Sequence, residues 1–202
     1  MVSAQAMIVL QPHRSEVLTY FERLVPEYRA YCVSVSKRSM ALSIESCAYL
    51  WYLCDTIKAR NVVDLGSGFS SYVLARYAAE ADYPVRVDSV DSDPEWLDKT
   101  RRFCESHGGV GSFMLGEVWE QTDRRYDVII NDYGRGAVRE QMAAIAVRRL
   151  TPAGVIMFDD APNSSHRHDA ARVCGEAGLA LLDLYHQTVD EVGRFALLGA
   201  RL

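Results

Sequence analysis

Residues 61–71, NVVDLGSGFSS, combine an apolar run, two glycines and a carboxylate, a set that could bind a nucleotide-like ligand. The run NVVDL predicts a strand. Gly66 and Gly68 then predict a turn into a helix, as in the dinucleotide motif G-x-G-x-x-G, although Ser71 replaces the third glycine. Asp64 precedes Gly66 by two residues and is expected at the mouth of the turn. There its charge would oppose a pyrophosphate, because no lysine or arginine stands within the segment. The turn therefore favours a ligand that carries a positive charge.

A second carboxylate, Asp91, is expected to close the strand VRVDSVD. A carboxylate at this position can accept hydrogen bonds from both hydroxyls of a ribose. Asp91 could instead cap the helix that follows, but Asp93, directly before Pro94, is better placed for that role. Together, Asp64 and Asp91 indicate a nucleoside with a cationic part rather than a dinucleotide.

Three further carboxylates are expected at the ends of two neighbouring strands: Asp132 after YDVIIN, and Asp159 and Asp160 after AGVIMF. Because the carboxyl ends of parallel strands meet at one edge of a sheet, we expect these side chains to converge. Oxygen ligands of this kind suit Mg²⁺ or a similar hard cation. Alternatively, Asp159 or Asp160 caps the following helix and Asp132 binds substrate directly. A carboxylate or a histidine must then accept a proton, and His166 is the candidate base.

The hydrophobic pattern predicts elements that place these residues at one edge. Strand and helix patterns alternate from residue 61 onward, which indicates an α/β fold with a doubly wound, mostly parallel sheet and helices on both faces. The predicted strands of the alternating part cover 61–65, 85–91, 111–115, 126–132 and 153–160.

Both ends of the chain differ from this alternation. Two strands near the C-terminus, in 179–186 and 194–202, are joined by residues 187–193 without a helix, and we expect them to form an antiparallel hairpin. Near the N-terminus, residues 14–31 are helical in pattern, and Pro26 is expected to open a second short helix.

The domain organisation predicted from this pattern is a single domain over residues 1–202. Within it, residues 1–42 form an N-terminal helical lid segment and residues 43–202 form the core. No long insertion follows the fourth strand, so segment 34–43 and loop 187–193 must cover the acceptor. Such a lid implies a small-molecule acceptor.

Composition limits the partners and the compartment. A formal charge of −5 and a pI near 5.5 weigh against nucleic acid, which requires a basic face. No segment has the pattern of a signal peptide or a membrane span, so we expect a cytoplasmic protein without a membrane partner. The five cysteines are scattered and are expected to be reduced. Trp51 and Tyr52 could face the core or the partner in a homodimer.

The motifs together resemble class I S-adenosylmethionine (SAM)-dependent methyltransferases over residues ~40–202. The resemblance rests on VVDLGSGFSS, SVDSD, LGE after the third strand, YDVIINDY and the final hairpin. It implies a Rossmann-like fold in which the glycine turn holds the methionine portion of the cofactor, Asp91 binds the ribose and Glu117 lies near the adenine. The residues expected to bind cofactor are Ser43, Asp64, Gly66, Ser67, Gly68, Ser71, Asp91, Ser92, Gly116, Glu117 and Asp132.

A narrower resemblance links YDVIINDYGR and AGVIMFDDAPN to the cation-dependent catechol and caffeoyl-coenzyme A O-methyltransferases. It implies metal ligands at Asp132, Asp159 and Asp160. Two residues depart from the family pattern. Asp160 stands where the family has asparagine, which adds a negative charge, and Arg135 stands where the family has its catalytic lysine. Arginine stays protonated, so Arg135 could bind an anionic substrate oxygen but is a poor base.

The expected function is methyl transfer from SAM to a small-molecule hydroxyl, with catalytic roles for Asp132, Arg135 and His166 and with Mg²⁺ or another divalent cation as a second cofactor. One alternative is a metal-free N- or O-methyltransferase that uses a carboxylate or histidine base. Another is an NAD-dependent oxidoreductase, against which Asp64 and the terminal hairpin weigh. The last alternative is a ligand-binding module without catalytic activity.

Overall fold

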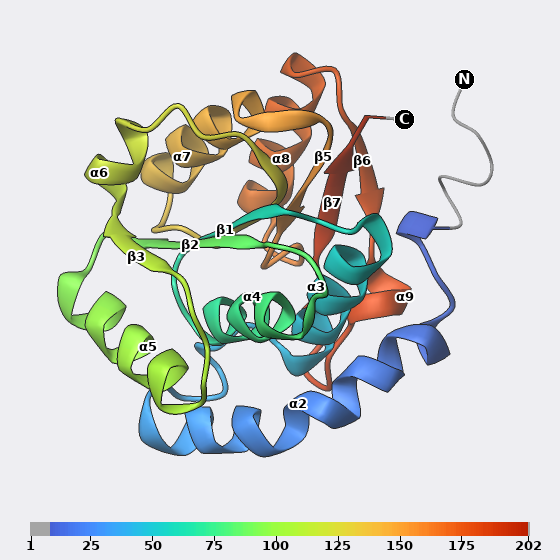
Figure 1. The fold of residues 1–202 in the computed structure, drawn as a ribbon. Helices are drawn as coiled ribbons and strands as arrows, with labels where there is room; N and C mark the ends of the chain where they lie inside the picture. The colour runs from blue at the N-terminus through green and yellow to red at the C-terminus, as the bar shows by residue number, and fades with distance from the viewer. Residues whose placement is uncertain (1–8, 202) are drawn as a thin grey trace.

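The computed structural model describes residues 9–201 and contains a seven-stranded sheet with the order β3-β2-β1-β4-β5-β7-β6 (Figure 1). The first five strands are parallel, and β7 runs antiparallel to both of its neighbours. The expected α/β fold with a doubly wound, mostly parallel sheet is therefore confirmed. The strands are β1 (Asn61–Leu65), β2 (Arg86–Asp91), β3 (Ser112–Leu115), β4 (Tyr126–Asn131), β5 (Leu150–Phe158), β6 (Ala180–Asp183) and β7 (Leu197–Ala200).

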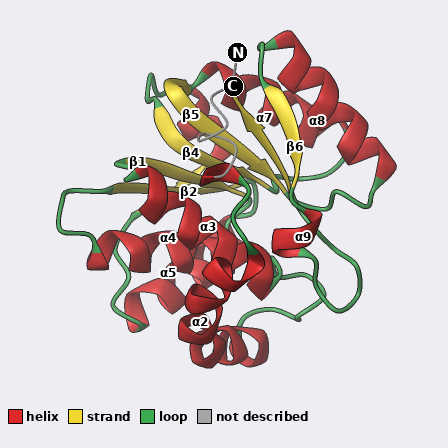
Figure 2. Ribbon diagram, turned by 90° about the vertical axis from the view of Figure 1, so that its right-hand side faces the viewer, coloured by secondary structure: helices red, strands yellow, loops and turns green. Residues whose placement is uncertain are grey.

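Helices cover both faces of the sheet and bury a separate apolar cluster on each (Figures 1 and 2). One face is covered by α2 (Arg14–Ser34), α3 (Ile44–Ile57), α4 (Phe69–Glu80) and α5 (Pro94–Ser106). The other is covered by α6 (Gly116–Glu120), α7 (Ala137–Arg148) and α8 (Ser164–Glu176). The central strands are apolar on both sides because both of their faces are buried, as parallel sheets require.

The N-terminal helix corrects one expectation. Pro26 lies inside the single helix α2 and does not open a second one. A proline removes one backbone hydrogen bond, but Leu24, Tyr28 and Tyr31 are buried on one face of the helix. Burial of a large apolar side chain contributes about 2 kcal/mol, so the tertiary contacts of this face offset the local cost.

The C-terminal hairpin is present, with Leu182 opposite Leu198, but its connection is not free of helix as expected. The short helix α9 (Tyr185–Thr188) lies between β6 and β7. Asp183 accepts a hydrogen bond from the Tyr185 amide at 2.8 Å, and Thr188 is fully buried. The hydrogen bond from the Tyr185 amide and the burial of Gln187 and Thr188 explain why this segment is helical.

Several side chains that the sequence left open are buried. Trp51 and Tyr52 pack in the core with the residues of α2 and α3, so neither presents a face to a partner. All five cysteines are free, and four of them are buried. Among the described residues, no helix is long and apolar enough to cross a membrane.

Candidate active site

The glycine turn between β1 and α4 is pressed against the end of β4. Gly66 has φ +101°, and a Cβ at this position would lie 2.4 Å from the carbonyl oxygen of Asp132. Its amide donates to the Val90 carbonyl at 2.9 Å, which ties the turn to β2. Both the backbone conformation and the close approach therefore require glycine here.

Asp64 lies beneath this turn rather than at its mouth, which differs from the expectation. It is fully buried, and its Oδ2 accepts hydrogen bonds from Ser70 Oγ at 2.7 Å and Ser71 Oγ at 2.6 Å. Its Oδ1 has no hydrogen-bond partner in the described part of the chain. Burial raises the pKa of Asp64 to about 7, while the two serine hydroxyls act in the opposite direction. Its carboxylate thus fixes the start of α4 from below.

A cavity of about 190 Å³ opens above the turn. Asp91 lines it, and its Oδ2 accepts a hydrogen bond from Ser67 Oγ at 3.1 Å. Asp93 caps α5 by accepting from the Trp96 amide at 3.1 Å, so Asp91 is not needed as a cap. The Trp96 indole donates to the Ser67 carbonyl, and Tyr31 reaches the same cavity from α2. The sequence indicated neither aromatic residue.

Two of the predicted cofactor residues have structural partners instead of lining this cavity. Ser43 is the N-cap of α3, where its hydroxyl accepts from the Ser46 amide at 3.1 Å. Ser71 donates to Asp64 as described above. Their roles toward a cofactor stay predictions.

The predicted adenine-side residues lie around Tyr133. A Cβ on Gly116 would lie 2.0 Å from the Tyr133 hydroxyl, so Gly116 makes room for that ring. Tyr133 is buried among the residues beneath α6 and α7. Glu117 and Ser92 are exposed, and neither lines the cavity.

A second cavity, of about 420 Å³, adjoins the first at Asp132, Gly134, Met40 and Ala41. Its polar lining comes from the ends of β4 and β5 and from the first turns of α7 and α8. We call this the acceptor cavity, after the role proposed for it. Its ionisable lining includes Asp132, Asp159, Asp160, Arg135, Arg139 and His166.

The three aspartates converge as the sequence predicted. One carboxylate oxygen from each of Asp132, Asp159 and Asp160 lies within 4.8 Å of the others. Burial raises the pKa of Asp159, and the nearby Asp132 acts in the same direction. Asp160 has φ +59°, a left-handed conformation that aspartate tolerates better than most residues. Neither Asp159 nor Asp160 caps α8, because Asn163 accepts from the Ser165 amide at 3.1 Å.

Arg139 lies among these carboxylates, which the sequence did not indicate. Its guanidinium pairs with Asp132 Oδ1 and lies 3.5 Å from Asp160 Oδ2. The same group lies 3.2 Å from His166 Nδ1. The sequence contained one signal for this contact. Arg139 is the third residue of α7 and His166 is the third residue of α8, so both lie in the first turn of a helix that follows one of the two strands.

The two other predicted catalytic residues also line the acceptor cavity. His166 is half-buried, and burial lowers its pKa, with Arg139 acting in the same direction. An Nδ1 that accepts from Arg139 carries no proton, so the neutral ring is protonated at Nε2. Arg135 is exposed at the rim.

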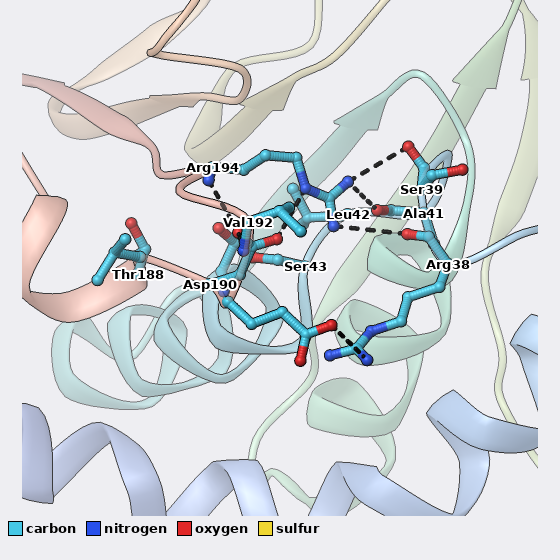
Figure 3. A network of polar contacts seen from close by, with 12 residues as sticks. Arg38, Ser39, Ala41, Leu42, Ser43, Thr188, Asp190, Val192 and Arg194 are labelled. Atoms are coloured by element: carbon cyan, nitrogen blue, oxygen red, sulfur yellow. Dashed lines mark hydrogen bonds and ion pairs between the residues drawn. The ribbon is translucent and has the colours of Figure 1, made fainter.

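Residues of segment 34–43 line both cavities and are joined by hydrogen bonds to the connection that follows α9 (Figure 3). Met40 and Ala41 line both cavities. Arg194, which follows the predicted lid loop, donates to the Ala41 carbonyl at 3.1 Å and the Ser39 carbonyl at 3.4 Å. Its Nε donates to the buried Asp190 at 2.8 Å. We call Arg194 and Asp190 the lid clamp.

Solved structures with this fold include methyltransferases. An O-methyltransferase from Bacillus cereus in complex with SAH gives a TM-score of 0.65 at 17% identity over 90% of each chain. Cofactor-bound Rv0187 from MTB gives 0.69 at 20% identity over 95% of this chain and 99% of that chain. The chain has a methyltransferase fold.

This methyltransferase fold does not decide the acceptor. RsmC from T. thermophilus, a 16S rRNA methyltransferase in complex with AdoMet and guanosine, gives a TM-score of 0.55 at 18% identity over 71% of this chain and 38% of that chain. No protein-family model matches the chain, and no curated protein matches it. The acceptor must therefore be argued from the cleft itself.

Proposed function

We infer that the protein is a SAM-dependent methyltransferase that acts on a hydroxyl of a small molecule. The observation that carries this proposal is the pair of adjoining cavities. One lies over the glycine turn and contains Asp91, and the other contains a cluster of ionisable groups. They meet at Asp132, so a methyl donor in the first can face an acceptor in the second.

The residues of the first cavity fit the proposed cofactor. The Tyr31 hydroxyl is buried, lines the cavity and has no hydrogen-bond partner among the described residues. Asp91 retains acceptor capacity for ribose hydroxyls, because each of its oxygens accepts one hydrogen bond within the protein. The unpaired Asp64 Oδ1 adds negative charge below the turn, which suits a cationic ligand better than a pyrophosphate.

SAM supplies a methyl group on a positively charged sulfur. The protein's contribution is mainly to position the acceptor oxygen in line with that group, which in favourable cases accounts for roughly 7–11 kcal/mol of a barrier. Asp132 lies where the two cavities meet, and Met40 and Ala41 line both of them. Burial raises the pKa of Asp132 to about 7, and Arg139 acts in the opposite direction. The acceptor hydroxyl must also lose its proton, and the carboxylates of the acceptor cavity are the candidate bases.

The acceptor proposed for this site is small. A cavity of about 420 Å³ lies within the usual range of roughly 300–1,000 Å³ for small-molecule sites. The formal charge of −5 disfavours a nucleic acid. The NAD-dependent alternative requires a pyrophosphate above Asp64, which its negative charge opposes.

The divalent cation implied by the narrower resemblance does not fit the cluster as it stands. Arg139 already pairs with two of the three aspartates. No step of the proposed reaction is therefore assigned to a metal.

Calorimetric titration with SAM, its demethylated product and NAD tests the function. We expect both sulfur compounds to bind one per chain and NAD not to bind. Gly66→Ala should abolish binding because its Cβ meets Asp132. Gly178→Ala is the matched control: Gly178 also has positive φ, at +67°, but a Cβ there meets nothing within 4 Å. Binding of NAD without SAM would reject the proposal.

Methyl transfer itself is tested by mass spectrometry with a panel of small hydroxyl compounds. A product heavier by one methylene, formed only when SAM and the protein are both present, supports the proposal. Transfer to an amine but to no hydroxyl would favour the N-methyltransferase alternative.

A further inference from the structure

All the hydrogen-bonding capacity of Arg139 is directed into the acceptor cavity. Its Nε donates to the Gly134 carbonyl at 3.2 Å, and its Nη2 faces the Asp132 carbonyl and carboxylate. Its Nη1 faces His166 Nδ1 and Asp160 Oδ2. A guanidinium has five N–H donors, and five acceptor atoms surround this one. The side chain is only 13% exposed.

This arrangement leaves no room for a second cation at the same carboxylates. A divalent ion bound to Asp132 and Asp160 would have to displace Arg139, which would leave a largely buried charge without its partners. A metal beside an undisplaced guanidinium would meet strong repulsion.

Positive side chains already line the cavity without a metal. Arg135 and Arg139 lie in the same lining as the three aspartates, together with Arg194, which is paired with Asp190. Asp160 adds a negative charge where the related cation-dependent enzymes carry asparagine, and Arg139 pairs with that added charge.

Asp159 is the carboxylate of the cluster that Arg139 does not contact. It is 7% exposed and lines the acceptor cavity. Within the described residues, the Asp160 backbone amide donates to it, and no side chain forms a hydrogen bond or an ion pair with it at 4.0 Å or less. A carboxylate offers about four lone-pair sites, so Asp159 keeps acceptor capacity for a ligand in the cavity that it lines.

We propose that Arg139 supplies the positive charge of the acceptor cavity in place of a divalent cation, and that Asp159 accepts the hydrogen bond of the acceptor hydroxyl. The second part rests on the proposed function. Arg139 thereby keeps Asp132 and Asp160 in place, and the acceptor is held by a carboxylate rather than by a metal.

Mn²⁺ binding, followed by the electron paramagnetic resonance signal of the free ion, tests the first part without any activity. Wild-type protein should bind no Mn²⁺ in the cleft. Arg139→Met should gain one site per chain, because three converging carboxylates then lack their counter-ion. Adding Asp159→Asn to this variant should remove the site, and Arg139→Lys should not gain it.

Arg135→Met is the matched control. It removes the same charge from the rim of the same cavity but leaves the pairs of Arg139 intact, so it should gain no site. One Mn²⁺ per wild-type chain that Asp159→Asn removes would overturn the proposal. A folded Arg139→Met that binds no Mn²⁺ would also overturn it. If Arg139→Met does not fold, the Mn²⁺ titrations of wild type, Arg139→Lys and Arg135→Met still test the first part of the proposal.

Activity tests the second part. After complete removal of metals by a chelator, the wild-type rate should be unchanged; a loss restored by Mg²⁺ would contradict the proposal. Asp159→Asn should lower kcat/KM for the acceptor about 10- to 100-fold and leave SAM affinity unchanged. An unchanged kcat/KM would refute the role of Asp159. If SAM does not bind at all, the proposed function fails, whereas the Mn²⁺ results still test Arg139.

Discussion

Asp64 illustrates how one buried side chain can serve both folding and binding. Its two serine partners come from the first turn of α4, so the carboxylate connects the end of β1 to the helix that follows. These two hydrogen bonds do not fully compensate burial, since Oδ1 is unpaired and the pKa is raised to about 7. A buried charge of this kind costs stability, and under the proposed function it would favour a cationic ligand above the turn.

The raised pKa predicts a pH dependence of stability. A carboxyl that is protonated more readily in the folded than in the unfolded chain contributes most below about pH 4, and this contribution is lost as the pH rises toward 7 and above. Between about pH 5 and pH 8, the unfolding free energy of wild type should fall by about 2 kcal/mol more than that of Asp64→Asn. Urea denaturation across this range measures the difference.

A matched control is Asp82→Asn, which alters an exposed carboxyl in the connection between α4 and β2. It should follow the wild-type pH dependence. Parallel curves for wild type and Asp64→Asn would show that Asp64 is ionised in the folded protein throughout this range.

At the scale of elements, the cleft is assembled from segments far apart in sequence. The lid clamp joins the connection after α9 to the segment between α2 and α3 (Figure 3). The Asp190 carboxylate pairs with the Arg194 guanidinium at 2.8 Å, and the Asp190 side chain is only 4% exposed. A second, exposed pair between Arg38 and Glu191 links the same two segments.

Arg194→Ala should loosen the lid. Loss of the charge-assisted hydrogen bonds to Ser39 and Ala41 should speed amide hydrogen exchange in residues 36–41 by at least about 10-fold. Arg38→Ala is the control, because an exposed pair contributes at most about 1 kcal/mol. Exchange measured by mass spectrometry compares the two variants. Equal, unchanged exchange in both would mean that the lid is held by other contacts.

At the scale of the whole molecule, α2 belongs to the core and also borders the cleft. Leu24 and Tyr31 are fully buried, and the Tyr31 ring lies 5.1 Å from that of Phe103 on α5. The helix therefore closes one face of the sheet, and its Tyr31 also lines the cavity over the glycine turn. The division into a lid segment and a core at residue 42 stays a prediction.

Leu24→Ala tests how strongly α2 is coupled to the remainder of the chain. We expect a loss of about 2–4 kcal/mol in unfolding free energy, in one cooperative transition. Val33→Ala on the same helix is the control, since Val33 is 90% exposed and should change stability by less than about 0.5 kcal/mol. Urea unfolding followed by fluorescence and by circular dichroism gives both values. If the main unfolding transition of Leu24→Ala is unchanged, α2 unfolds independently of the rest of the chain.

The sequence by itself determined the alternating α/β order, the glycine turn, and the convergence of Asp132, Asp159 and Asp160. These features depend on local periodicity and on the rule that parallel strands end at one edge. The expected place of Asp64 at the mouth of the turn is wrong, because a strand pattern does not show on which side of the turn a carboxylate lies.

Only the tertiary structure decided which groups meet the carboxylates and what closes the cleft. Arg139, Arg194 and Tyr31 reach the cleft from the helix after β4, the loop before β7 and the N-terminal helix. Long, flexible side chains have no spacing that reveals their partners, and a hydrogen bond between residues 153 positions apart leaves no local pattern. The positive charge beside the aspartates therefore became evident only when the chain was folded.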